Sequence, residues 1–290
     1  MKVKKLLGAA FAVGLGLAVI STATVADAQG KGKPKKETPA APAAEPPTTK
    51  NPIVLIPAGI AWGMSTKQVA TAIDKLIDAA FKPIYQKTSP GVKMKALDAQ
   101  VAEEKSAFRR SRIDFNALPT GIDATPLKGE YTYLNKESML TLEREDVDQK
   151  TQAKTKVKTH FFFIQDKLWK VIDERTLGEG NPRGKDFTEA VTKLAVVYGA
   201  GRVLQADYDK GRNSTEVDWK DSATHLRAVE RMGGSAYAIV LEDNLTLGNL
   251  ASLRPNKPAD ENAIDPDVAA VTRKGDAPAP PPAPPGKQKR

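Results

Sequence analysis

The sequence predicts an α+β fold, with amphipathic helices packed on antiparallel sheet. Apolar residues recur at helical spacing between residues 64 and 112, alternate at strand spacing between 129 and 174, and then repeat this order between 186 and 253. Apolar residues three or four apart share a helix face, whereas residues two apart share a strand face. Because strands follow helices instead of alternating with them, the pattern is typical of α+β and not of α/β architecture. We therefore predict two helix-then-strands modules, over residues 51–178 and 179–254, flanked by disordered ends.

The first 28 residues have the pattern of an export signal. Three lysines precede a 15-residue uncharged run, and the segment ends in Ala26-Asp27-Ala28. The run is shorter than the roughly 20 residues that cross a bilayer. We expect a cleaved signal peptide (1–28), a mature periplasmic or secreted chain from Gln29 and no transmembrane span after cleavage; a retained signal that serves as an anchor is the alternative.

Both flanks of the predicted modules have compositions typical of disorder. Residues 29–50 are rich in Lys, Pro and Ala and show no apolar period, as expected of a linker. Residues 255–290 form a Pro-rich tail with too few large apolar side chains to offset the entropy lost on ordering.

The chain contains no cysteine and has a formal net charge of +9. It therefore has neither a disulfide nor the cysteine that carries a lipoprotein's lipid anchor. Residues 51–254 hold 30 lysines and arginines against 27 acidic residues, so the flanks carry most of the excess charge. Since no nucleic-acid-binding motif accompanies it, we expect no nucleic acid partner. An anionic envelope polymer or an envelope protein is the expected kind of partner.

The first module begins with two predicted helices. Apolar residues after Gly63 follow one helical stripe: Val69, Ile73, Leu76, Ile77 and Ala80. Ser65 and Gln68 have the spacing of a capping box, so the helix should begin there. A second helix over 96–112 has a narrow apolar face formed by Leu97, Val101 and Phe108.

Four strands are predicted next, over 129–134, 138–145 and two within 156–174 that turn at Gln165-Asp166. Residues 160–164 place large apolar groups on both strand faces, which indicates a central strand covered on both sides.

The second module repeats the order. A helix should begin at Asp186, with Glu189 three residues later, and end at Gly199. Strands are expected over 202–208, 215–219, 224–232 and 235–243. A short closing helix would follow, with Leu245, Leu247, Leu250 and Leu253.

The "GMSTKQV" helix start, the second helix and the strands after it resemble the helix-helix-strand pattern of small envelope proteins of the BamE/SmpA type. The resemblance covers about 110 residues and rests on one short motif. It implies a scaffolding role in outer-membrane assembly, but those proteins are lipoproteins and this chain lacks cysteine. No functional residue is carried over from it.

Candidate catalytic groups are few. Ser65 lies two residues from Lys67, whereas serine-lysine hydrolases use S-x-x-K, which brings both groups to one helix face. We interpret Ser65 and Gln68, like Asp186 and Glu189, as helix caps and not as sites. His160 and His225 each lie in a predicted strand and lack a metal-binding or catalytic motif.

Arg109, Arg110 and Arg112 near a helix end are the candidate contact for an anion or a partner. No catalytic residue, metal site or cofactor is predicted. We expect an exported, non-enzymatic envelope protein that binds or scaffolds another envelope component. The alternatives are a periplasmic hydrolase that uses His160 or His225 with distant carboxylates, and a secreted enzyme inhibitor.

Overall fold

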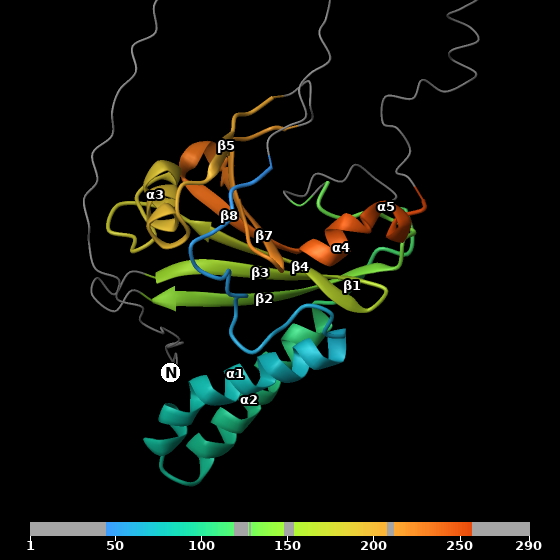
Figure 1. The fold of residues 1–290 in the computed structure, drawn as a ribbon. Helices are drawn as coiled ribbons and strands as arrows, with labels where there is room; N and C mark the ends of the chain where they lie inside the picture. Colours follow the sequence, from blue (N-terminus) through green and yellow to red (C-terminus); the bar gives the residue numbers. More distant parts are fainter. Residues whose placement is uncertain (1–44, 119–126, 128, 148–153, 208–211, 257–290) are drawn as a thin grey trace, which may run out of the picture.

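The computed structural model describes residues 45–118, 127, 129–147, 154–207 and 212–256. The predicted signal peptide, most of the linker and nearly all of the tail lie outside these residues. The strands are β1 (Ile113–Asp114), β2 (Glu137–Val147), β3 (Lys154–Ile164), β4 (Lys167–Thr176), β5 (Arg202–Leu204), β6 (Glu216–Lys220), β7 (Thr224–Arg231) and β8 (Ala236–Asp243). They form one antiparallel sheet in the order β1-β2-β3-β4-β8-β7-β6-β5 (Figure 1). The predicted α+β class is confirmed, and both predicted halves contribute to the same sheet.

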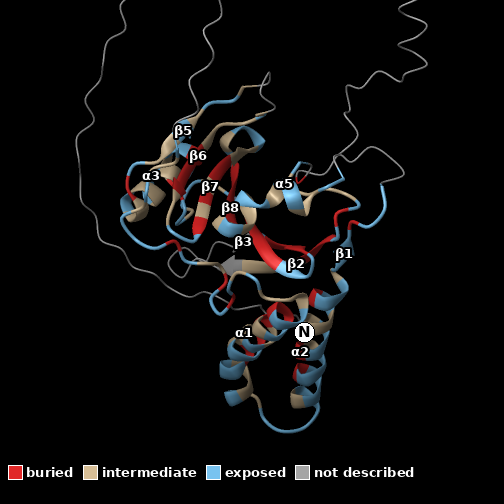
Figure 2. Cartoon of the chain, turned by 45° about the vertical axis from the view of Figure 1, so that its right-hand side comes forward, coloured by how far each residue is buried: buried red, intermediate tan, exposed pale blue. Residues whose placement is uncertain are grey.

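Three long helices lie on one face of the sheet: α1 (Thr66–Gln86), α2 (Val92–Arg110) and α3 (Phe187–Tyr198). They share a core with alternate strand residues such as Phe161 and Phe163. The short helices α4 (Asn244–Gly248) and α5 (Leu250–Leu253) lie on the other face, over a smaller core that contains Phe162 and Ile164. The prediction that residues 160–164 are covered on both sides is thus confirmed, and Figure 2 shows the buried residues along the sheet.

The predicted helix caps are present. Gln68 N donates to Ser65 Oγ (3.3 Å), and Ser65 N donates to Gln68 Oε1 (2.8 Å), which completes a capping box. At α3, Glu189 N donates to Asp186 Oδ1 (2.9 Å). Gly199 ends that helix at a φ of 94°, a conformation that glycine adopts at little cost.

A turn and a bulge orient the side chains of β4. Gln165 and Asp166 both have positive φ and join β3 to β4, as predicted. The register of these two strands shifts between Phe162 and Phe163. Because of this bulge, Leu168 packs in the helix-covered core, whereas Trp169 packs in the core on the opposite face.

Several boundaries differ from the sequence prediction. Residues 129–134 do not form a strand: Tyr131 stacks on Phe115 with ring centroids 4.1 Å apart, and Leu134 has a positive φ that ends any extended run. The two-residue β1 pairs with β2 instead.

Helix α2 begins at Val92 and ends at Arg110, and the closing helix divides at Asn249 into α4 and α5.

The predicted linker ends earlier than residue 50. Lys220 N donates to Pro47 O (3.0 Å), Thr49 N donates to Lys220 O (3.0 Å) and Lys50 N donates to Tyr198 O (3.1 Å). This segment therefore lies along the end of β6 at Lys220, just beyond Arg202, the first residue of β5. At its other end β5 stops at Leu204, so the strand predicted over 202–208 is confirmed only for its first residues.

Candidate functional site

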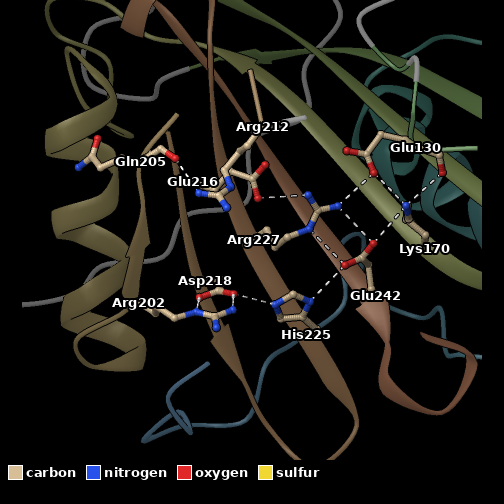
Figure 3. Close-up of polar contacts among 10 residues, drawn as sticks. All are labelled: Glu130, Lys170, Arg202, Gln205, Arg212, Glu216, Asp218, His225, Arg227 and Glu242. Atoms are coloured by element: carbon tan, nitrogen blue, oxygen red, sulfur yellow. Dashed lines mark hydrogen bonds and ion pairs between the residues drawn. The ribbon is translucent and has the colours of Figure 1, made fainter. Parts of the chain in front are cut away.

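A group of charged side chains crosses the sheet on the face opposite α1, α2 and α3 (Figure 3). The strand register places these residues on one face, since Lys170 is paired with Glu242, Glu242 with His225 and Arg227 with Asp218. We call the set the sheet-face network; it consists of Glu130, Lys170, Arg202, Glu216, Asp218, His225, Arg227 and Glu242.

Glu242 lies at the centre of the network and is almost fully buried. Its carboxylate contacts Lys170 Nζ (3.1 Å), Arg227 Nε (3.2 Å) and His225 Nδ1 (3.2 Å). Burial alone would raise the pKa of Glu242, but the charges of Lys170 and Arg227 and the bond from His225 hold this pKa well below its usual value. Glu242 is therefore an ionised carboxylate inside the protein.

Lys170 and Arg227 connect Glu242 to the rest of the network. Lys170 Nζ also contacts Glu130 Oε2 (2.8 Å). Arg227 faces three carboxylates, those of Glu242, Glu130 and Glu216, and their charges raise its pKa although burial opposes the charged form. The pKa of Glu130 is correspondingly lowered by Lys170 and Arg227, against the effect of burial. Each cation thus compensates more than one buried carboxylate.

His225 bridges two carboxylates. Its Nδ1 lies 3.2 Å from Glu242 Oε2 and its Nε2 lies 3.2 Å from Asp218 Oδ2. Both ring nitrogens can donate only in the imidazolium form. Burial opposes that form, but the bonds to Asp218 and Glu242 outweigh it, so the pKa of His225 is raised. Arg202 adds two bonds to Asp218 (3.0 and 2.5 Å).

With His225 protonated, the network contains four cations and four carboxylates. Every ring nitrogen and guanidinium group in it already faces a carboxylate from this chain. A buried network in which each charged group has partners orders the strands that carry it.

His160 lies elsewhere on the same face, in β3, and is separated from β7 and His225 by β4 and β8. Its Nδ1 lies 3.0 Å from Thr141 Oγ1, and its Nε2 lies 3.4 Å from Glu174 Oε2. The bond from His160 lowers the pKa of Glu174 although burial opposes this. The order hydroxyl, imidazole, carboxylate is that of a hydrolase triad. The Thr141 amide, however, donates to Ser111 Oγ (2.8 Å) and is unavailable to an oxyanion.

The three arginines predicted as a contact site are each ion-paired. Arg109 bonds Asp74, Arg110 lies 2.6 Å from Glu103, and Arg112 lies 2.9 Å from Asp114. These pairs are solvent-accessible, so an external anion would have to compete with a carboxylate that is already in place. The structure does not bring the three guanidinium groups together on one ligand position.

One shallow hollow of about 460 Å³ lies between the 58–59 loop and α1. Its lining includes the apolar residues Met64, Ala72 and Leu76 and the charged residues Lys67 and Lys75. Neither histidine contributes to it. Within the described ranges, no group of three or more His, Asp or Glu side chains could hold a metal ion.

One part of the network is visible as a pattern in the sequence. Charged residues occupy every second position in β6 (Glu216, Asp218, Lys220) and β7 (His225, Arg227), as on a sheet face that is not apolar. Lys170 and Glu242 could not be found in this way, because they stand among apolar neighbours in strands that are buried on both faces.

No helix among the described residues is both long and apolar enough to cross a bilayer. Comparisons with protein-family models, with curated proteins and with solved structures gave no match.

Proposed function

We propose that this protein is an exported, non-enzymatic component of a bacterial cell envelope, which binds or scaffolds another envelope component from the periplasm or outside the cell. The N-terminal signal pattern and the absence of cysteine support export as a cysteine-free, unlipidated protein. The anionic character expected of envelope polymers is matched by the basic N-terminal flank.

The hypothesis that the protein is not an enzyme rests mainly on the sheet-face network, in which the charged groups are bonded to one another. His225, a natural candidate for a general base, has both ring nitrogens directed at carboxylates, and its raised pKa favours the protonated form, which cannot accept a proton. The shallow hollow on α1 lies away from both histidines. We therefore assign the sheet-face network a role in stabilising the fold, and we expect a partner to bind elsewhere on the accessible surface.

Export and binding can be tested separately. The full chain with a C-terminal tag is produced in a Gram-negative host, the cells are fractionated, and the N-terminus of the tagged protein is sequenced. We expect a periplasmic or secreted form that begins at Gln29. An intact Met1 on a membrane-attached form would contradict cleavage, and a cytoplasmic location would contradict export.

Binding is then tested by cross-linking the tagged protein in intact envelopes and identifying the captured component by mass spectrometry. The same component should be captured by wild type and by the His160→Asn variant, since a scaffold needs no catalytic histidine. Failure to capture any component above the level of an unrelated periplasmic protein would contradict the proposal.

The competing function is a hydrolase centred on Thr141, His160 and Glu174, which the hydroxyl–imidazole–carboxylate order favours. A panel of chromogenic esters and amides is tested with wild type and with Thr141→Val, which keeps the shape and removes the hydroxyl. Turnover that Thr141→Val abolishes without unfolding the protein would replace the binding proposal with this one.

A further inference from the structure

We propose that the tip of the α1–α2 hairpin, residues 82–95, docks on the surface of an anionic lipid bilayer. Figure 1 shows the hairpin extending away from the sheet, with its tip at the far end. A flat surface can therefore reach the tip without meeting the strands. A bilayer would be one partner surface for the proposed envelope protein, and the charges and exposure of the hairpin favour it independently of that function.

The three aspartates of the hairpin form contacts within it. Asp74 pairs with Arg109, and Asp78 Oδ1 lies 2.6 Å from Lys105 Nζ across the two helices. Nearer the tip, Tyr85 Oη donates to Asp98 Oδ1 (2.8 Å). These three contacts hold α1 and α2 together. The two ion pairs engage Asp74 and Asp78, whereas Asp98 keeps its charge because its partner is a neutral phenol, and the lysines at the tip outnumber it.

The tip itself carries Lys82, Lys87, Lys93 and Lys95, all exposed. Within the part of the chain that the structure describes, none of them forms an ion pair. Residues 66–110 contain nine lysines and arginines and five acidic residues, a net charge of +4, whereas the whole of 51–254 has a net charge of +3. The positive excess of the folded part is therefore concentrated in this hairpin.

The local sequence at the tip works against helix stability. The first turn of α2 contains Lys93 and Lys95 and no acidic residue, and its N-cap, Gly91, provides no side-chain bond. Cations at this end of a helix are disfavoured by the helix dipole. Sequences that disfavour local structure are often found at functional sites. Lysines at the start of α2 would be explained by a role in attracting an anionic surface.

Val92, at the centre of these lysines, favours a lipid over a soluble polymer. It is the most exposed of the large apolar side chains among the described residues, at 86 %. An apolar side chain between lysines can enter the interfacial region of a bilayer while the ammonium groups remain at the headgroups. A hydrated anionic polymer would attract the lysines but would give Val92 no apolar environment.

The absence of cysteine allows a site-specific test. Val92→Cys in the full chain is labelled with an environment-sensitive fluorophore and mixed with vesicles of equal parts phosphatidylglycerol and phosphatidylcholine. The matched control is a label at Met232→Cys, because Met232 is the other strongly exposed apolar residue, at 81 %, and lies in the β7–β8 turn. We expect a blue shift with the label at 92 and none with the label at 232.

The same label at 92 is then measured in a variant with Lys82, Lys87, Lys93 and Lys95 all changed to Gln. Each lysine near an anionic surface contributes to binding, so the vesicle concentration at half-maximal shift should rise by about tenfold or more. Higher salt should weaken the shift in wild type.

The proposal is overturned if the label at 92 does not respond, if both labels respond alike, if the four-lysine variant responds like wild type, or if phosphatidylcholine alone gives the same shift. Because the assay uses purified protein and vesicles, these outcomes do not depend on whether the cell exports the protein. Circular dichroism of each variant verifies that the hairpin remains helical.

Discussion

Some single residues in this protein set where a helix begins or ends, and others neutralise a buried charge. Ser65 is a clear case of the first kind, because its hydroxyl and the Gln68 side chain satisfy two amides that helix geometry leaves without partners. His225 is a case of the second kind, because it is the titratable cation between Asp218 and Glu242.

Replacement of Ser65 by Ala should lower the free energy of unfolding by about 1 kcal/mol, the usual cost of a lost N-cap. Urea unfolding followed by circular dichroism measures the change. The control is Ser89→Ala, at an exposed position in the loop before α2, which should leave the free energy of unfolding nearly unchanged. Equal losses in the two variants would contradict the capping role.

The protonation of His225 should make stability fall as pH rises above the unfolded pKa of histidine, about 6.5. Folding raises the pKa of His225, so its stabilising contribution is fully present below its unfolded pKa of about 6.5 and is lost as pH rises through the folded pKa. His225→Asn removes this contribution. The difference in unfolding free energy between wild type and variant should therefore be large at pH 6 and smaller at pH 9.

Urea unfolding at the two pH values measures that difference. Glu242 acts in the opposite direction: its pKa is lowered on folding, so its contribution is present above its unfolded pKa of about 4.3 and is lost on acidification. A difference between wild type and His225→Asn that is the same at pH 6 and pH 9 would show that the imidazole is not the charged bridge.

At the scale of elements, the sheet has two faces of different chemistry. The face under α1, α2 and α3 holds the larger apolar core, with the buried pair of Asp173 and Arg175 at one end. The opposite face holds a smaller apolar core, the polar group of His160 in β3, and the charged residues that cross β8–β5. The bulge in β4 turns Trp169 to the face that carries the charged network. There the Trp169 ring contacts the network, since Lys170 Nζ lies 4.4 Å from the ring centroid.

Lys170→Met should destabilise the protein strongly, by roughly 3 kcal/mol or more, because it leaves Glu242 and Glu130 with less compensating charge in a buried position. The matched control is Lys193→Gln, which breaks the exposed pair with Glu189 and should change stability little. Thermal and urea unfolding compare the two. A Lys170→Met protein as stable as wild type would mean that the network adds no net stability at this point.

At the scale of the whole molecule, the pairing of β4 with β8 joins the two halves through seven residue pairs. The N-terminal segment also connects them, since Ile53 N donates to Asp221 Oδ2 (2.7 Å) and Trp62 Nε1 donates to Thr224 Oγ1 (3.0 Å). The two predicted modules thus share a sheet and a core.

We therefore expect the two halves to unfold together. The full chain should give one transition that is the same by circular dichroism and by tryptophan fluorescence. A fragment of residues 45–178 would expose the edge and both apolar faces of β4, and should aggregate or lack a cooperative transition. A sharp, reversible transition in this fragment would instead show that the first module folds by itself.

The sequence by itself determined those features that depend on neighbours along the chain. Ser65 with Gln68, Asp186 with Gly199, and Gln165-Asp166 mark helix ends and a hairpin, because caps and turns are made by residues a few positions apart. The α+β class and most strands followed from apolar periodicity. The same local logic was wrong for residues 129–134, where stacking of Tyr131 on Phe115 prevailed over strand propensity.

Only the tertiary structure decided the features that depend on partners far apart in sequence. The union of both halves in one sheet requires the pairing of β4 with β8, and no local pattern specifies which strands become neighbours. For the same reason, His225 could not be connected to Asp218 and Glu242, nor His160 to Thr141 and Glu174, until the register placed them side by side. Hydrogen bonds and buried charges act over a few ångströms in space, and folding alone determines which residues come that close.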